Sequence, residues 1–313
     1  MTKIAFLFPG QGSQYVGMGK DLYNNYTVSK KVFDTADSIL GKSITKLCFE
    51  GLEEDLKQTI NTQPAIVTMS ISALEALKEA GIRADYTAGH SLGEYCAMYA
   101  SGVMSLETTL KAIQKRAELM NSVARGSMSA VLNASEEQLK AGLAEGSKIG
   151  YVDIANYNSP IQVVITGDSN AVKAAGDYML SIGVKRVVPL PVSGAFHSKY
   201  MENAGNEFNE FIKDLPLNNA NIPVITNVDA EITINAEDFR LKMPKQIYSS
   251  VRWTQTIQKM ISEGVDTFVE IGPGKILAGL NRKINPEVKT YSVYDVESLK
   301  NLILEINGVV VRG

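Results

Sequence analysis

The first candidate catalytic residue in the sequence is a serine, Ser91. The stretch Gly89–Gly93 reads Gly-His-Ser-Leu-Gly, so Ser91 has a glycine two residues away on either side. This spacing is typical of a nucleophile elbow, a sharp turn from a strand into a helix whose crowded backbone leaves no room for a Cβ at the two glycines. A strand-like run precedes the turn at 85–88, and a helix is expected over 92–100. The pattern therefore predicts that Ser91 is a nucleophile in acyl transfer.

A serine hydroxyl needs a base to take its proton, and the chain offers two histidines, His90 and His197. His90 adjoins Ser91, and neighbouring side chains on a sharp turn point apart, so we expect His90 to line the pocket. A lone histidine is more often structural than catalytic. However, Ser91 has no other candidate partner, and the order serine before histidine matches enzymes of the α/β-hydrolase type. We therefore predict that His197 is the general base.

The composition is that of an ordinary globular protein. The chain has 313 residues, of which 45% are hydrophobic and 21% charged, with a net charge of −3. The lack of a basic excess argues against a nucleic-acid partner. No stretch approaches 18 apolar residues, and Ile4–Phe8 is too short for the apolar segment of a secretion signal, so we expect no membrane partner and a cytoplasmic location. Cys48 and Cys96 have neither a disulfide nor a metal spacing.

The elements that must position Ser91 and His197 alternate between strands and helices. An apolar run at 3–8 predicts a buried strand, a helix is expected from Pro64 to Gly81, and an amphipathic helix at 106–120 carries Arg116. Further strands are expected at 224–227, 267–271 and 290–293, with a closing helix at 296–306. This alternation predicts an α/β core with a parallel sheet, formed by residues 1–125 and 193–313.

The pattern of expected strands and helices changes between residues 126 and 192. Strands are expected at 128–132, 152–156, 162–166 and 184–189, and helices at 135–143 and 170–181. The order βαββαβ in about 65 residues is that of a ferredoxin-like unit. We therefore predict a small subdomain, 126–192, inserted into the core.

The loop Pro9–Gln14 follows the first strand and could cradle a phosphate. However, the dinucleotide fingerprint needs a third glycine at position 15, which is Tyr15. A nucleotide-binding domain without enzyme activity is therefore the more distant alternative.

Four motifs together resemble one family. They are Pro9–Gln14, Gly89–Glu94, Gly194–Ser198 and Glu270–Gly274, and in this order and spacing they are similar to the malonyl-CoA:acyl carrier protein transacylases over essentially the whole chain. The resemblance implies an α/β-hydrolase-like core with an inserted ferredoxin-like subdomain. It also implies transfer of a malonyl group from malonyl-CoA to acyl carrier protein for fatty-acid synthesis, without a cofactor. Polyketide synthesis stays open as the pathway, and a monomer is expected.

The resemblance also implies a role for particular residues. Ser91 would attack the thioester and form a malonyl-enzyme, and His197 would take and return the proton. The backbone N–H groups of Gln11 and Leu92 would form the oxyanion hole. Arg116 would pair with the free carboxylate of malonate, although by its sequence alone it would be taken for a solvated helix charge.

No Asp or Glu presents itself as a third member of a triad. The resemblance implies instead that a backbone carbonyl near Gln246 supports His197. Ser250 stands where the family commonly has proline, so the turn there could be looser. The substrate-binding residues that the resemblance implies, besides Arg116, are His90, Gln246, Phe196 and Asn156. The nearest alternative function is a serine thioesterase or esterase, which uses the same elbow and histidine but does not need Arg116.

Overall fold

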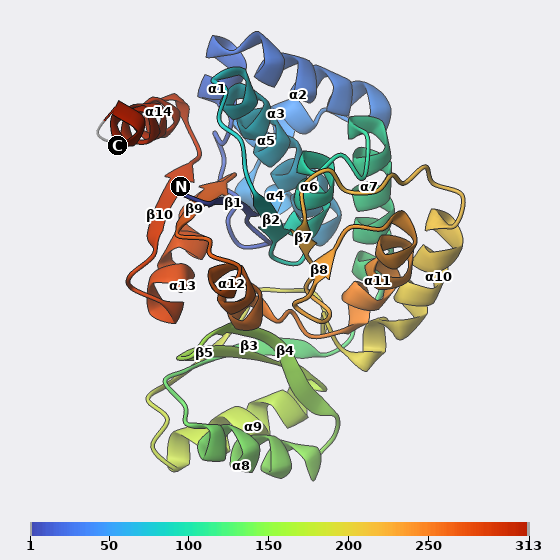
Figure 1. The fold of residues 1–313 in the computed structure, drawn as a ribbon. Helices are drawn as coiled ribbons and strands as arrows, with labels where there is room; N and C mark the ends of the chain where they lie inside the picture. The colour runs from blue at the N-terminus through green and yellow to red at the C-terminus, as the bar shows by residue number, and fades with distance from the viewer. Residues whose placement is uncertain (1, 312–313) are drawn as a thin grey trace.

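The larger of two sheets is the parallel sheet that the sequence predicts. The protein is represented by a computed structural model that describes residues 2–311 (Figure 1). The six-stranded sheet has the order β10-β9-β1-β2-β7-β8, and every neighbouring pair is parallel except β7 with β8. Its strands are β1 (Ile4–Phe8), β2 (Tyr86–Gly89), β7 (Val224–Ile225), β8 (Ile232–Thr233), β9 (Thr267–Ile271) and β10 (Lys289–Val293). The predicted α/β class with a parallel-sheet core is confirmed.

Helices cover both faces of this sheet because β1 is apolar on both sides. Phe6 and Phe8 belong to the cluster that contains buried residues of α5 (Thr59–Glu79) and α6 (Gly93–Ala100). Ala5 and Leu7 belong to a second cluster with α12 (Trp253–Ser262) and α13 (Ile276–Ile284). Successive side chains of a strand point to opposite faces, so one continuous apolar run builds both interfaces.

The remaining helices surround this core. They are α1 (Lys20–Asn25), α2 (Thr27–Leu40), α3 (Ile44–Glu50), α4 (Glu53–Lys57), α7 (Leu106–Ser122), α10 (Glu202–Ile212), α11 (Ala236–Tyr248) and α14 (Val296–Val311), with a 3₁₀ turn at Lys199–Met201. None of the described helices combines the length and the hydrophobicity that a transmembrane span requires.

The predicted start of the central helix at Pro64 is wrong. Helix α5 begins at Thr59 and contains Pro64 in its interior. A proline has no N–H for the carbonyl four residues earlier, which here is that of Ile60. That carbonyl accepts instead from Nζ of Lys42 at 3.3 Å. A lysine from elsewhere in the chain thus offsets the bond that the proline removes.

The second sheet is antiparallel and has the order β4-β5-β3-β6. Its strands are β3 (Ser127–Leu132), β4 (Val152–Ser159), β5 (Gln162–Gly167) and β6 (Arg186–Pro189), with α8 (Glu136–Ser147) and α9 (Ser169–Ser181) between them. Figure 1 shows both helices on the face turned away from the large sheet. The predicted order βαββαβ is observed, and Ser135 caps α8 as expected, in a capping box with Gln138.

The two sheets meet through the chain near Val251. The N–H of Val251 donates to the carbonyl of Ala155 at 2.8 Å, and the N–H of Tyr157 donates to the carbonyl of Val251 at 2.9 Å. These bonds hold β4 beside the segment that follows α11, and that segment takes part in the site described below.

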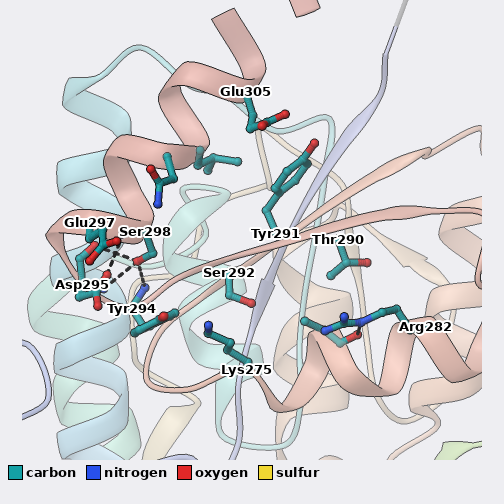
Figure 2. A pocket seen from close by; sticks show the side chains of 13 residues that line it. Lys275, Arg282, Thr290, Tyr291, Ser292, Tyr294, Asp295, Glu297, Ser298 and Glu305 are labelled. Atoms are coloured by element: carbon teal, nitrogen blue, oxygen red, sulfur yellow. Dashed lines mark hydrogen bonds between the residues drawn. The ribbon is translucent and has the colours of Figure 1, made fainter. Parts of the chain in front are cut away.

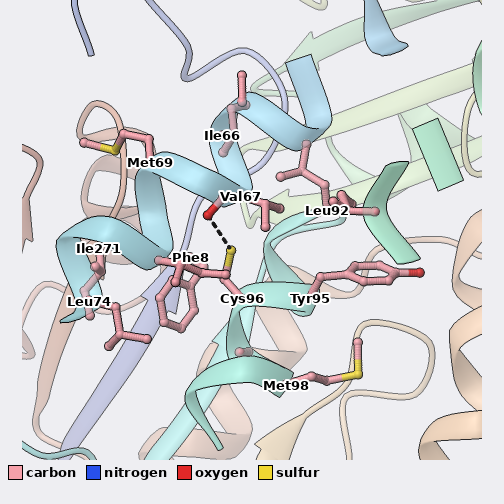
Figure 3. Packing of buried hydrophobic residues seen from close by; sticks show 14 of the residues in the cluster. Phe8, Ile66, Val67, Met69, Leu74, Leu92, Tyr95, Cys96, Met98 and Ile271 are labelled. Carbon is pink, nitrogen blue, oxygen red and sulfur yellow. Dashed lines mark hydrogen bonds between the residues drawn. The ribbon is translucent and has the colours of Figure 1, made fainter. Parts of the chain in front are cut away.

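The helix after the elbow is fixed by close packing. Figure 3 shows Cys96 of α6 against Val67 of α5, with Phe8 of β1 alongside. The Sγ of Cys96 lies 3.9 Å from the carbonyl oxygen of Val67, and burial raises the pKa of this thiol. Both Cys48 and Cys96 are buried and free.

Candidate active site

The turn at Ser91 has the geometry of a nucleophile elbow. Strand β2 ends at Gly89, α6 begins at Gly93, and Ser91 between them has a φ of 52°. A Cβ on Gly89 would lie 1.9 Å from the carbonyl carbon of Gly93, and one on Gly93 would lie 2.2 Å from the carbonyl oxygen of Phe8. Both glycines are therefore required by the close approach of the backbone.

The serine and histidine singled out in the sequence lie together. The Oγ of Ser91 is 2.8 Å from Nε2 of His197. The Nδ1 of His197 is 3.0 Å from the carbonyl oxygen of Gln246 and 3.1 Å from that of Ser249. Since two acceptors face Nδ1, we place the ring proton there, which leaves Nε2 free to accept from the serine. Carbonyl groups thus take the place of the acidic residue found in many triads.

Burial decides the protonation of His197. Removal from water, together with the nearby Arg116 cation and His90, lowers the pKa of His197 to about 3. The imidazole is therefore neutral near pH 7, which is the form that can accept a proton.

Arg116 is a buried cation beside the serine. Its side chain, on α7, is 1% exposed, and one Nη2–H donates to Oγ of Ser91 at 3.0 Å. Gln63 accepts from Nη1 at 2.7 Å and Gln246 accepts from Nη2 at 2.9 Å. No carboxylate of a described residue lies within 4.0 Å of the guanidinium, and Nε has no partner among those residues. The prediction that Arg116 is a solvated helix charge, the alternative by sequence alone, is wrong.

Gln246 contacts each of these three residues. Its side-chain oxygen accepts from Arg116, its Nε2 donates to the carbonyl of Ser91 at 2.7 Å, and its own carbonyl faces His197. The turn that follows is tied to β4, because Oγ of Ser250 donates to the carbonyl of Ile154 at 2.5 Å. A looser turn, which the serine at position 250 suggested, is therefore not observed.

The two residues predicted to form an oxyanion hole lie on neighbouring strand ends. Gln11 follows β1, Leu92 follows β2, and both line the cavity that contains Ser91. Within residues 2–311, neither backbone N–H donates to a protein acceptor. Both backbone N–H groups are therefore available to donate to the oxyanion of a bound reaction intermediate.

The cavity has a volume of about 380 Å³, enough for an acyl group and part of its carrier. His90, Phe196 and Asn156 line it, and their role in substrate binding stays a prediction. His90 does not face Ser91: its Nε2 lies 2.8 Å from Oδ1 of Asn158, and its ring centroid is 5.5 Å from that of Trp253. The loop Pro9–Gln14 contributes to this cavity. A dinucleotide site would need a helix that begins at the end of this loop, whereas α1 does not begin until Lys20.

Sequence reasoning missed several polar residues at the site. Gln63 orients Arg116, and Asn227 accepts a hydrogen bond from the Ser91 N–H. Asn227 was expected at the end of a strand over 224–227, but β7 ends at Ile225 and Asn227 turns towards the elbow. The one available signal for Gln63 was a polar residue directly before the apolar run of α5.

A second cavity, of about 420 Å³, lies between α13, β10 and α14. Figure 2 shows Lys275 and Arg282 on one side of it and Asp295 and Glu305 on the other. Its lining contains hydroxyl groups but no histidine beside them, and charges of both signs are mixed. Acyl transfer is therefore better served by the cavity that contains Ser91.

Comparison with known proteins agrees with this chemistry. The family described as "Acyl transferase domain" matches residues 5–296. The malonyl CoA-acyl carrier protein transacylase of Bacillus subtilis is 44% identical over 96% of both chains. The crystal structure of a malonyl CoA-acyl carrier protein transacylase from Clostridium perfringens has a TM-score of 0.94 at 37% identity over 99% of both chains. A malonyl-transacylase solved in complex with a type II polyketide-synthase acyl-carrier protein has a TM-score of 0.94 at 34% identity, covering 97% of this chain and 100% of that one.

Proposed function

The chain belongs to the malonyl CoA-acyl carrier protein transacylases, and on that premise we propose that it transfers a malonyl group from malonyl-CoA to the phosphopantetheine thiol of acyl carrier protein. The observation that carries the proposal is that Arg116, a buried cation, lies 3.0 Å from the Ser91 hydroxyl and pairs with no carboxylate of a described residue. Malonyl-CoA brings that carboxylate. The product is an extender unit for fatty-acid synthesis.

The reaction proceeds in two half-reactions through a malonyl-serine. His197 takes the Ser91 proton at Nε2 while the serine oxygen attacks the thioester carbon. The backbone N–H groups of Gln11 and Leu92 stabilise the resulting oxyanion. The carbon–sulfur bond then breaks, and the CoA sulfur leaves with the proton held by His197. In the second half-reaction the carrier thiol gives its proton to His197, attacks the malonyl-serine, and Ser91 recovers the proton.

Arg116 selects the donor. A guanidinium has five N–H donors, and Ser91, Gln63 and Gln246 engage three of them. The donors that remain are one on Nε and one on Nη1, which point apart, so a bidentate carboxylate must also take the Nη2–H that Ser91 accepts in the free enzyme; neither glutamine need be released. Such charge-assisted bonds offset the desolvation of the malonyl carboxylate. The rest of the acyl site is formed by His90, Phe196 and Asn156. Gln246 binds both Arg116 and His197 and so fixes their positions relative to each other.

We propose that the two sheets belong to two structural units, a core and an inserted subdomain. The parallel sheet that presents Ser91 at a strand end supports an α/β-hydrolase-like core of residues 1–125 and 193–313. The order β4-β5-β3-β6 with two helices on one face supports a ferredoxin-like subdomain, 126–192. His197 follows directly after this subdomain, so the active site is built where the two meet.

The partners follow from the reaction. Acyl carrier protein is the acceptor, as supported by the solved complex of a related malonyl-transacylase with its acyl-carrier protein. The chemistry needs only serine, histidine, arginine and backbone donors, so we propose that the enzyme uses no cofactor. We further propose a monomer that acts in the cytoplasm.

Release of CoA distinguishes this function from that of a serine thioesterase or esterase. With malonyl-CoA alone, a transferase should release about one equivalent of CoA per enzyme and then stop until a carrier thiol is added. A hydrolase should release CoA until the donor is exhausted. Continuous release without an acceptor, at the rate seen with acceptor, would contradict the proposal.

A further inference from the structure

One amide side chain bridges the elbow. Asn227, in the loop after β7, accepts a hydrogen bond at Oδ1 from the Ser91 N–H at 2.7 Å. Its Nδ2 donates to the carbonyl of Gly89 at 2.7 Å. The strand end and the serine are therefore both bound by a group from more than a hundred residues further along the chain.

The elbow needs such support because Ser91 has a positive φ of 52°. A residue other than glycine keeps this conformation only where its surroundings hold it. Asn227 binds the N–H of Ser91, and Nε2 of Gln246 binds its carbonyl at 2.7 Å. Both backbone groups of the serine are thus engaged by amide side chains.

Asn227 is itself held by Glu94. Glu94 lies in the first turn of α6, and its Oε2 accepts from the N–H of Asn227 at 2.6 Å. Both residues are 1% exposed. Burial raises the pKa of Glu94 to about 8, so the carboxyl is mostly protonated near neutral pH, and glutamine is its closest neutral counterpart.

The arrangement has a consequence for the reacting groups. Asn227 binds the N–H of Ser91, whereas the next N–H, that of Leu92, donates to no acceptor among the described residues, and Leu92 lines the cavity. A rotation of the elbow would move the Ser91 hydroxyl away from His197 and displace the Leu92 N–H at the same time. Displacements of about 1 Å at a reacting group can cost about 10²-fold in rate.

We propose that Asn227, held by Glu94, is a positioning residue for the nucleophile: it fixes the strained elbow so that the Ser91 hydroxyl meets His197 and the Leu92 N–H meets the oxyanion. This inference rests on the proposed function, in which Ser91 is acylated. Neither Asn227 nor Glu94 lines the cavity. The pair should therefore govern the rate of acylation and not the affinity for the donor.

Single-turnover acylation by malonyl-CoA, followed by intact mass spectrometry, separates these two quantities. Asn227→Ala should lower the maximal acylation rate by about 10²-fold and leave the half-saturating concentration within about twofold. Asn281→Ala is the matched control, since Asn281 is also buried but lies on α13 outside this cavity. Per folded molecule, the control should acylate at the wild-type rate.

Two variants of Glu94 provide a second test of the proposal, again by their acylation rates. Glu94→Ala should slow acylation by about tenfold, whereas Glu94→Gln should recover most of the rate because its amide oxygen can accept from the Asn227 N–H. An unchanged rate in folded Asn227→Ala, or equal losses in the two Glu94 variants, would overturn the proposal. Failure of both alanine variants to fold would assign the pair to the fold and would overturn it too. A wild-type enzyme that malonyl-CoA does not acylate would instead contradict the proposed function.

Discussion

At the scale of single residues, three polar groups lie together in surroundings of low dielectric: the Ser91 hydroxyl, the His197 imidazole and the Arg116 guanidinium. Burial lowers the pKa of His197 to about 3 and keeps the imidazole neutral. Arg116 stays charged in the same surroundings because a guanidinium does not lose its proton in proteins. A neutral base and a fixed cation within hydrogen-bond distance of one hydroxyl favour a substrate that is both an acyl donor and an anion.

Replacing Arg116 should change donor preference. Malonyl-CoA differs from acetyl-CoA by one carboxylate, and two charge-assisted hydrogen bonds to it are worth about 10²–10⁴ in preference. Arg116→Ala should therefore lose most of its kcat/KM for malonyl-CoA and retain that for acetyl-CoA, with Arg116→Lys between them. Equal losses for both donors would show that Arg116 serves the structure and not recognition.

The two histidines should differ in their effect on acylation. His197→Ala should slow the step by about 10³-fold or more, because the Ser91 hydroxyl loses its base. His90→Ala should be milder, since His90 bonds to Asn158 and not to Ser91. The low pKa of His197 keeps the base form as the pH falls, so the wild-type acylation rate should not show a loss centred on pH 6.5. A loss centred there, or equal effects of the two variants, would contradict the assignment.

At the scale of elements, the elbow exists because a strand, a turn and a helix crowd against the end of β1. The N–H of His90 donates to the carbonyl of Phe8 at 2.9 Å, and the backbone of Gly93 lies against the same carbonyl. The strands thus bring Gln11 and Leu92 to one edge of the sheet, where loops after parallel strands commonly form binding sites.

Substituting the elbow glycines should destabilise the fold. Gly89→Ala places a Cβ 1.9 Å from the backbone of Gly93, so one segment must move, and we expect a loss of about 3 kcal/mol or more. Gly279→Ala in α13 is the matched control, because nothing lies within 4 Å of its added Cβ and alanine favours a helix by about 1 kcal/mol. Thermal unfolding should show a large fall in Tm for the first and no fall for the second; similar values would contradict the steric account.

At the scale of the whole molecule, buried carboxyl groups couple stability to pH. Glu270 on β9 is fully buried, accepts from the N–H groups of Leu277 and Ala278, and has a pKa raised to about 7 by burial. Between pH 4.5 and 7 the folded protein therefore binds more protons at this site than the unfolded chain does. The stabilisation is complete below the unfolded pKa and is lost as the pH rises through the folded one.

Glu270→Gln should remove this dependence. Its free energy of unfolding should fall less steeply than that of the wild type between pH 5 and 7, by up to about 3 kcal/mol over the range. Since every other titrating group is shared, the difference between the two proteins isolates Glu270. Parallel curves from chemical denaturation at several pH values would contradict the raised pKa.

Much of this molecule could be predicted from local patterns. The strand runs, the capped helix at Ser135 and the glycine spacing around Ser91 act through neighbours in the chain, so the sequence shows them directly. The start of α5 could not be predicted, since Lys42 offsets the bond that Pro64 removes. The role of Asn227 could not be predicted for the same reason. Its contacts with the elbow join segments far apart in the sequence, and a single amide residue forms no recognisable pattern.

The most direct test of the central claim is the position of the acyl group. The wild-type protein, mixed with malonyl-CoA and digested, should yield one peptide heavier by a malonyl group, and fragmentation should place the group on Ser91. Ser91→Ala should fold, with an unchanged Tm within error, and should acquire no malonyl group. A malonyl group on another residue of the wild type, or on folded Ser91→Ala, would contradict the account.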